Sequence, residues 1–246
     1  MLNKKAGRYR DIYPDSFYKN LLSLGIGLKG QSILDIGTGT GVLPRGLYKY
    51  GARFVGVDIS KEQIETAINI SKENGMDIEY HVRPAEATQL PSDSFDVITA
   101  CQCFLYFDKE LVIPEIKRML KKDGIFAAMW MAWVPGEDKV SGLSEKIVLK
   151  YNPHWNAGGY TRQKVNESEW EACGLKVKDV VSYDEKLPFD IDSWCGRIRA
   201  CRGIGASLPE DKIIEFDNEH RKAILENFGT EFEVLHHILI VTLKSV

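Results

Sequence analysis

The stretch Leu34-Asp35-Ile36-Gly37-Thr38-Gly39-Thr40-Gly41 decides the fold of this 246-residue chain. A short apolar approach precedes it, and an amphipathic segment begins at Val42, so we predict a strand, a glycine turn and a helix. Glycines at alternate positions permit positive φ angles and let backbone N–H groups approach a ligand, because no Cβ stands in the way. The stretch is therefore predicted to be a ligand-binding loop.

An acidic residue, Asp35, stands just before the first glycine. A carboxylate repels a pyrophosphate and attracts a cation or an amino group. The dinucleotide-binding pattern G-x-G-x-x-G is not met, because the glycines fall at positions 37, 39 and 41 and position 42 is Val. The sequence also lacks the phosphate-binding pattern G-x-x-x-x-G-K-[ST]. These observations disfavour a nicotinamide dinucleotide or a nucleoside triphosphate as the ligand.

Strand-like and helix-like segments alternate along the rest of the chain. Beyond the first strand we predict strands at 53–58, 78–82, 95–101, 125–133, 175–183 and 232–243. We predict helices at 15–24, 42–51, 60–74, 111–120, 143–151, 167–173, 194–202 and 210–227. Repeated strand–helix units of this kind predict a parallel sheet with helices on both faces.

Two local signals refine these boundaries. Ser60 is a predicted N-cap, and Gln63 stands at the matching capping-box position three residues later. The residues from Lys121 to Gly124 are predicted to be a turn before the fifth strand.

Two segments interrupt the strand–helix rhythm and are predicted to be helical insertions. We predict a single domain over residues 1–246 whose parts are a core at approximately 28–135, 166–184 and 231–246, cap insertions at approximately 136–165 and 185–230, and an N-terminal arm or lid at 1–27. In an open α/β sheet, ligands bind outside the carboxyl ends of the strands, so insertions near the sheet are placed to cover the ligand.

Composition and charge narrow the class of protein. A net charge of −3 and a pI near 6.0 provide no overall basic field, which disfavours nucleic acid as the main partner. The sequence shows no signal peptide and no apolar run long enough to span a bilayer, so we expect a cytoplasmic protein. Its five cysteines lack C-x-x-C spacing, as expected of free thiols in a reducing compartment.

A metal site is disfavoured. Cys101 and Cys103 are two residues apart on a predicted strand and would face the same way, but no second ligand pair stands out among the histidines at 81, 154, 220, 236 and 237. We therefore expect no metal.

The glycine loop and a second acid carry a resemblance to a known family. Asp35 and the three glycines meet the pattern D-x-G-x-G-x-G, and Asp58 ends the second predicted strand. In these features the chain resembles class I methyltransferases that use S-adenosylmethionine. In that family the second acid grips the ribose hydroxyls, since a carboxylate accepts two O–H donors.

Further motifs extend the resemblance over about residues 31–126. Arg83-Pro84-Ala85-Glu86 stands where the family places an alanine followed by Glu or Asp against the adenine. The residues Leu90–Val97 and Lys122–Gly124 also resemble the usual sequence of the family at these positions. Gln102–Asp108 resembles the signature Q-x-F-H-W-F-D of a small-molecule branch that includes ubiquinone and menaquinone biosynthesis enzymes. Here the His position is Leu105 and the Trp position is Tyr106, so the general base of that branch is missing.

The resemblance implies a Rossmann-like, doubly wound α/β fold: a seven-stranded mixed sheet, its last strand antiparallel, with helical cap insertions. It implies S-adenosylmethionine as the cofactor, S-adenosylhomocysteine as its product and a small molecule as the methyl acceptor. The implied cofactor-binding residues are Asp35, Gly37, Thr38, Gly39, Gly41, Asp58, Ile59, Gln63, Ala85, Glu86, Cys101, Tyr9 and Tyr13. Tyr106 and His154 are candidate catalytic residues.

Several alternatives stay open at this stage. Tyr106 is equally explained as a core aromatic, and the lead around Tyr9 and Tyr13 as a surface arm. Four aromatic residues could line an acceptor pocket or simply pack the insertion: Trp130, Trp133, Trp155 and Tyr160. Three arginines could bind an anionic acceptor or lie on a solvated helix face: Arg197, Arg199 and Arg202. The rival functions are an RNA or DNA methyltransferase and a non-catalytic S-adenosylmethionine-binding protein.

Overall fold

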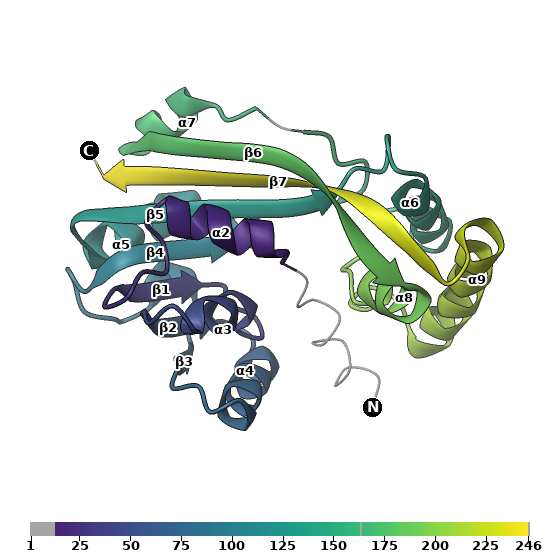
Figure 1. The fold of residues 1–246 in the computed structure, drawn as a ribbon, viewed down its shortest axis with the longest axis horizontal. Coiled ribbons are helices and arrows are strands. Elements are labelled where there is room, and N and C mark those ends of the chain that lie inside the picture. Colours follow the sequence, from purple (N-terminus) through teal and green to yellow (C-terminus); the bar gives the residue numbers. More distant parts are fainter. Residues whose placement is uncertain (1–12, 163, 246) are drawn as a thin grey trace. The chain divides into compact units, whose positions relative to one another are not determined.

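The computed structural model describes residues 13–162 and 164–245, and the predicted site residue Tyr9 lies outside them. Its strands form one sheet in the order β3-β2-β1-β4-β5-β7-β6 (Figure 1). The strands are β1 Ser32–Ile36, β2 Arg53–Asp58, β3 Glu79–Val82, β4 Phe95–Cys101, β5 Leu120–Trp133, β6 Leu175–Asp190 and β7 Glu231–Ser245.

Adjacent strands from β3 through β2, β1 and β4 to β5 are parallel, and the arrow of β7 runs opposite to the arrows of β5 and β6 in Figure 1. This arrangement confirms the prediction of a seven-stranded mixed sheet whose last strand is antiparallel.

The helices lie close to the predicted segments. They are α2 Asp15–Ser23, α3 Val42–Tyr48, α4 Lys61–Glu73, α5 Lys109–Met119, α6 Lys139–Tyr151, α7 Glu167–Ala172, α8 Ile191–Arg199 and α9 Glu210–Phe228. Two short 3₁₀ turns, η2 Ala85–Ala87 and η3 Phe104–Tyr106, follow β3 and β4. Both turns stand at the carboxyl ends of strands, where ligands of parallel sheets bind.

The residues predicted as a turn before the fifth strand instead belong to β5. Phe95 pairs with Leu120 and Val97 pairs with Ile125. Between these two pairs the chain advances by two residues in β4 and by five residues in β5. The extra residues form a bulge, with Asp123 at φ 68°. The Lys121 ammonium bonds both carboxylate oxygens of Asp96 at 3.0 Å, which keeps the bulge against β4.

The described residues divide into two compact units. The sheet unit comprises residues 13–130, 164–182 and 239–245, and the helical unit comprises residues 131–162 and 183–238. Strands β5, β6 and β7 contribute residues to both units. The expected single domain with cap insertions stays a prediction.

The core of the sheet unit lies on one face of the sheet. Leu34 and Ile36 of β1 share that face with residues of β4 and β5, because alternate residues of a strand point the same way. Helix α5 buries Val112 and Ile116 against them, and Trp170 of α7 packs on the same cluster. Helices α3 and α4 instead contact β2. None of the helices within the described ranges is long and apolar enough to cross a membrane.

Candidate cofactor site

The predicted ligand loop lies at the carboxyl end of β1. Gly37, Gly39 and Gly41 have φ angles of 65°, 57° and 77°. Residues with a side chain rarely adopt such angles, which explains why three glycines alternate here. Helix α3 starts directly after Gly41, so the loop joins a strand to a helix as predicted.

Asp35 lies in a row of residues that crosses the sheet below this loop. It pairs with Gly56 of β2 on one side and with Thr99 of β4 on the other. The Thr99 hydroxyl donates to Asp35 Oδ1 at 2.7 Å. The Asp35 side chain is only 3 % exposed, and burial raises its pKa to about 6 although the bond from Thr99 opposes the shift. Asp35 therefore changes its charge near pH 6.

Asp58, at the carboxyl end of β2, holds the loop directly. Its Oδ2 accepts the Gly39 N–H at 2.9 Å, and its Oδ1 accepts the Ser60 N–H at 2.8 Å. Ser60 Oγ accepts the Gln63 N–H at 3.3 Å, so the predicted N-cap of α4 is confirmed. The reciprocal bond of the predicted capping box is absent, because the Ser60 N–H is already donated to Asp58.

The other residues predicted on the ribose and adenine side follow β2 and β3. Ile59 is 77 % exposed directly after Asp58, and Gln63 is half-buried in the first turn of α4. Ala85 is buried in η2, while Glu86 Oε1 accepts the Asp108 N–H at 3.1 Å. That bond links the loops after β3 and β4. The exposed side chain of Ile59 offers an apolar surface on which a flat ring can lie.

Two neutral thiols lie at the end of β4. The Cys101 thiol donates to the Tyr13 oxygen at 3.1 Å, and the Cys103 thiol donates to the Ile36 carbonyl at 3.1 Å. Burial raises the pKa of Cys101 to about 12 and raises the pKa of Cys103 well above its usual value. Since the thiolate is the nucleophilic form, neither group is reactive at neutral pH. Tyr13 is half-buried, and its ring stacks on Phe17 with the ring centroids 4.6 Å apart.

The two candidate catalytic residues belong to different units. Tyr106 is 51 % exposed in η3 of the sheet unit, and Leu105, at the position of the missing base, is 58 % exposed. Phe104 anchors this turn by stacking on Trp170 at 5.2 Å, so the core-aromatic reading applies to Phe104 rather than to Tyr106. His154 is exposed in the loop after α6 of the helical unit.

Most aromatic residues predicted near the acceptor are explained by packing. Trp130 packs against the core of the sheet unit, whereas Trp133 donates to Glu145 Oε1 at 2.6 Å in the helical unit. The Trp155 ring stands 3.0 Å from where a Cβ on Gly158 or Gly203 would lie. Tyr160 stacks on His237 with the ring centroids 6.2 Å apart.

The three arginines of the second insertion differ in their surroundings. The Arg197 guanidinium lies over the Trp133 ring at 5.6 Å, which is a cation–π geometry. Arg199 pairs with Asp217. Arg202 follows α8, outside a regular helix.

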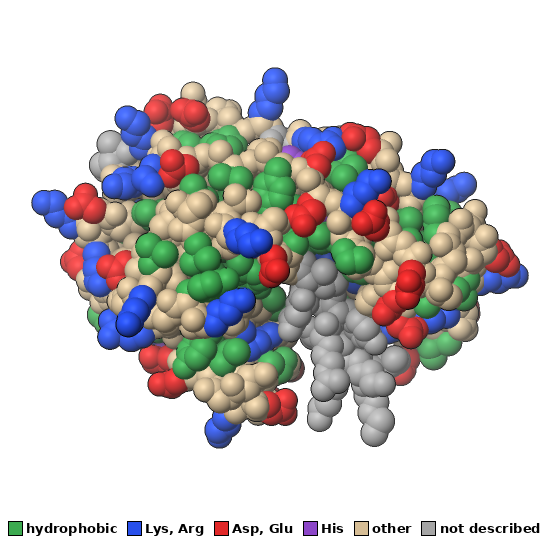
Figure 2. Space-filling model, viewed as in Figure 1, with side chains coloured by type: hydrophobic (Ala, Val, Ile, Leu, Met, Phe, Trp, Pro, Cys, Tyr) green, Lys and Arg blue, Asp and Glu red, His purple; other side chains and the backbone are tan. Residues whose placement is uncertain are grey.

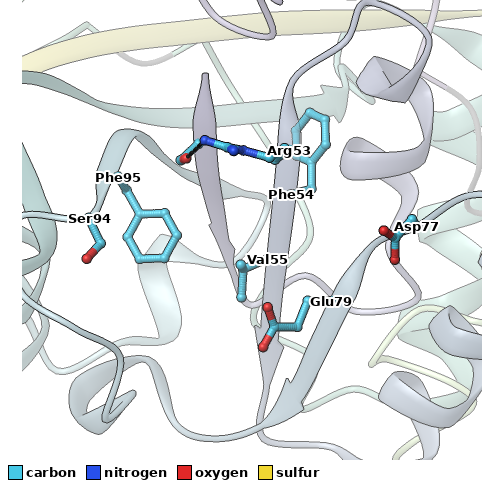
Figure 3. Close-up of a pocket in the computed structure, with 8 residues that line it drawn as sticks. Arg53, Phe54, Val55, Asp77, Glu79, Ser94 and Phe95 are labelled. Carbon is cyan, nitrogen blue, oxygen red and sulfur yellow. Dashed lines mark hydrogen bonds between the residues drawn. The ribbon is translucent and has the colours of Figure 1, made fainter. Parts of the chain in front are cut away.

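A pocket at the opposite ends of the strands is not this site. Figure 3 shows its lining from the beginnings of the parallel strands, including Arg53 at the start of β2, Glu79 at the start of β3 and Phe95 at the start of β4. The glycine loop, Asp58 and Cys101 lie at the other ends of β1, β2 and β4. The pocket therefore contributes nothing to the predicted cofactor site.

Comparison with known proteins agrees with this geometry. Residues 34–128 match the family model of a methyltransferase domain. The uncharacterized methyltransferase YcgJ of Bacillus subtilis is 28 % identical over 207 residues, which cover 79 % of this chain and 77 % of YcgJ. A ubiquinone biosynthesis O-methyltransferase of Actinobacillus pleuropneumoniae is 33 % identical over 105 residues, but these cover only 40 % of this chain and 45 % of that enzyme.

Solved structures show the same fold. The crystal structure of YcgJ aligns with a TM-score of 0.56 and 26 % identity, covering 92 % of this chain and 97 % of YcgJ. A geranyl diphosphate methyltransferase solved with its S-adenosylmethionine aligns with a TM-score of 0.53 at 18 % identity, covering 94 % and 85 %. The chain carries a methyltransferase domain at residues 34–128 and has the fold of the class I methyltransferases. It is an S-adenosylmethionine-dependent enzyme whose methyltransferase domain includes the glycine loop.

Sequence reasoning missed three residues that shape the loop. Thr99 bonds Asp35, Cys103 lies against Gly37, and Tyr80 of β3 lies against Gly41. Gly56, inside β2, was the available signal, since a glycine in a strand interior often marks the close approach of another group. The partner of that glycine depends on strand register, which a single sequence does not specify.

Gly39 and Gly41 have different surroundings, so replacing each by alanine should lower the unfolding free energy by a different amount. At Gly39 a Cβ would lie 3.0 Å from the flexible Gln63 Oε1, whereas at Gly41 it would fall far inside contact distance of the Tyr80 hydroxyl. We expect Gly39→Ala to cost about 1–2 kcal/mol of unfolding free energy through its positive φ. Gly41→Ala should cost a further 1–3 kcal/mol, roughly, from overpacking. Urea unfolding of both variants measures the difference, and equal losses would contradict the assigned contact.

Proposed function

We propose that this protein transfers the methyl group of S-adenosylmethionine to a small-molecule acceptor in the cytoplasm. The observation that carries the proposal is the pair of carboxylates around the glycine loop. Asp35 lies in the strand before the loop, and Asp58 binds the loop from the neighbouring strand. Free cysteines in the described residues support a reducing compartment.

The residues at this site fit the cofactor. Each Asp58 oxygen accepts one backbone N–H and so retains lone-pair capacity for a ribose hydroxyl. The glycines leave the loop backbone open to close approach, because a Cβ is missing at three alternate positions. Asp35 would pair with the amino group of the methionine part, and Ile59 and Ala85 would offer apolar contacts to the adenine.

Catalysis on this reading depends mainly on positioning. S-adenosylmethionine supplies a methyl group that its sulfonium already makes labile. The chain has to hold the acceptor in line with that methyl group and exclude water, which can contribute about 7–11 kcal/mol. The neutral thiols of Cys101 and Cys103 suit the end of β4, because a thiolate there would compete for the methyl group.

The class of acceptor is inferred from the relatives and from charge. The ubiquinone biosynthesis O-methyltransferase and the geranyl diphosphate methyltransferase act, by their names, on small molecules. On the face drawn in Figure 2, Lys and Arg side chains are interspersed with Asp and Glu. Together with the net charge of −3, this mixture gives little support to a nucleic-acid acceptor.

Transfer of a labelled methyl group tests the proposal. The purified protein is incubated with tritium-labelled S-adenosylmethionine and a protein-free metabolite extract, and label is followed into the extracted small molecules. We expect label in at least one fraction with wild type and far less label in that fraction with Asp58→Ala. If S-adenosylhomocysteine binds by calorimetry but no fraction gains label, the chain is a cofactor-binding protein rather than this enzyme.

Cofactor affinity should depend on the charge of Asp35. Burial holds the pKa of Asp35 at about 6, so this carboxyl group becomes protonated as pH falls below that value. The protonated group has to release its proton before it can pair with an ammonium group. We expect S-adenosylhomocysteine affinity to be flat above pH 7 and to fall by up to about tenfold per pH unit below pH 6. Calorimetry from pH 5 to pH 8 measures this. Asp35→Asn should bind more weakly and with a flat profile, and a flat wild-type profile would refute the pairing.

A further inference from the structure

Tyr80 occupies a space that two glycines leave open. It stands on β3 in register with Gly56 of β2. A Cβ on Gly56 would lie 2.7 Å from the Tyr80 ring and 2.9 Å from the Thr38 methyl group. Real Cβ atoms do not approach other groups this closely, so the Tyr80 ring lies across β2 only because position 56 is glycine.

The Tyr80 hydroxyl reaches the last glycine of the loop. A Cβ on Gly41 would overlap this hydroxyl and would lie 2.9 Å from the ring carbon that carries it. The hydroxyl is held by Ser71 of α4, with the two oxygens 3.1 Å apart. Gly41 is buried, so the hydroxyl fills the space behind the loop where the loop enters α3.

The loop is therefore held at three successive residues. Asp58 accepts the Gly39 N–H, Arg45 of α3 donates to the Thr40 carbonyl, and Tyr80 lies behind Gly41. The first two contacts fix polar backbone groups. The third is steric and sets how far the loop can fall back toward β3.

We propose that Tyr80 is a positioning residue of this enzyme. Its hydroxyl lies against Gly41 and keeps the glycine loop at the distance from β3 that cofactor binding requires. The inference rests on the proposed function of the loop. It assigns Tyr80 no contact with the cofactor. Losing the hydroxyl should lower cofactor affinity while the folded state and the chemical step are largely kept.

The chain provides a matched control for removing a tyrosine hydroxyl. Tyr48, on α3 of the same unit, accepts the Asp77 N–H at 3.0 Å through its hydroxyl. Tyr48→Phe therefore removes a tyrosine hydroxyl and its hydrogen bond from the sheet unit without touching the loop, whereas Tyr80→Phe removes a hydroxyl that interacts with both Ser71 and Arg45. If hydrogen bonding to the fold were the only role of Tyr80, both variants would behave alike.

The first experiment compares these two variants. We expect Tyr80→Phe to weaken S-adenosylhomocysteine binding by about three- to tenfold, the range of a typical net hydrogen bond. KM for S-adenosylmethionine should rise by the same factor with kcat unchanged, while Tyr48→Phe leaves both constants within about twofold, less than the weakest bond is worth. Equal affinities of wild type and Tyr80→Phe, or equal losses in both variants, would overturn the proposal. Failure of wild type to bind S-adenosylhomocysteine would instead overturn the proposed function.

The second experiment tests the contact itself. Gly41→Ala is measured in wild type and in a Tyr80→Leu background, where no hydroxyl stands behind the loop. We expect the added methyl group to weaken S-adenosylhomocysteine binding at least fivefold less in the Tyr80→Leu background, because only the positive φ of residue 41 still opposes it. The same loss in both backgrounds would show that Tyr80 does not set the loop. If Gly41→Ala fails to fold in wild type and folds with Tyr80→Leu, the contact is supported; failure in both would count against it.

Discussion

Replacing Asp58 by alanine is expected to weaken binding of S-adenosylmethionine and S-adenosylhomocysteine by about 100-fold or more. A hydrogen bond to a charged group contributes about 1.5–3 kcal/mol to the binding free energy, and the bonds from both ribose hydroxyls to Asp58 would be lost together. Each 1.4 kcal/mol is about a factor of ten in affinity, so two such bonds account for at least about 100-fold. Asp58 also holds the Gly39 and Ser60 N–H groups, so its removal frees the loop as well.

Calorimetry on Asp58→Ala, Asp58→Asn and wild type measures this loss. The asparagine variant keeps the shape but turns an N–H donor toward a backbone N–H, so it should also bind weakly. Asp96→Asn is the matched control, because Asp96 likewise accepts a backbone N–H, from Ser32, at the opposite ends of the strands. Unchanged affinity in Asp58→Ala would remove the ribose assignment, and an equal loss in Asp96→Asn would show that the effect is not local.

The strands of the parallel half of the sheet could be predicted from the sequence because each strand carries its own local signal. β2 and β4 have the predicted limits, since apolar runs between turn residues mark buried strands directly. β5 and β6 run longer than predicted. Their additional residues form strand because they pair with other strands. In β5, for example, Leu120 pairs with Phe95 of β4, and this pairing is not encoded locally.

The cofactor loop was readable for a similar reason, and its supports were not. Asp35, the three glycines and Asp58 stand at fixed spacings that follow from one strand–turn–helix unit and the next strand. Thr99 and Tyr80 meet this loop only through the register of β4 and β3. A register shift of one residue would turn either side chain to the other face of the sheet. No pattern within a single strand distinguishes the two registers.

The helical unit buries two neutral histidines, and this predicts that acid will destabilise it. His220 Nε2 bonds the Ser144 hydroxyl oxygen at 2.9 Å, and His236 Nδ1 bonds the Val234 carbonyl at 2.9 Å. Among the described residues, neither second ring nitrogen has a partner. Burial lowers the pKa of each histidine to about 4; Arg221 adds to the effect at His220 and Arg197 at His236, where Asp138 opposes it.

The sign of the pH effect follows from which state takes up protons. Unfolded histidine titrates near pH 6.5 and the folded residues near pH 4, so the unfolded state binds more protons between these values. The contribution of the neutral histidines is full above about pH 6.5 and is lost as pH falls toward 4. A shift of about 2.5 pKa units corresponds to about 3 kcal/mol for each histidine. The two together should remove about 6 kcal/mol of stability by pH 4.

Urea unfolding at intervals from pH 7 to pH 4, followed by tryptophan fluorescence, tests this expectation. His220→Gln retains a donor toward Ser144, and His236→Asn retains a donor toward Val234, while both remove the buried titrating ring. Each variant should lose about half of the histidine-dependent slope, and the double variant nearly all of it. His154→Gln is the control, because His154 is exposed in the same unit and should leave the slope unchanged. A double variant with the wild-type slope would show that other groups govern the acid sensitivity of the fold.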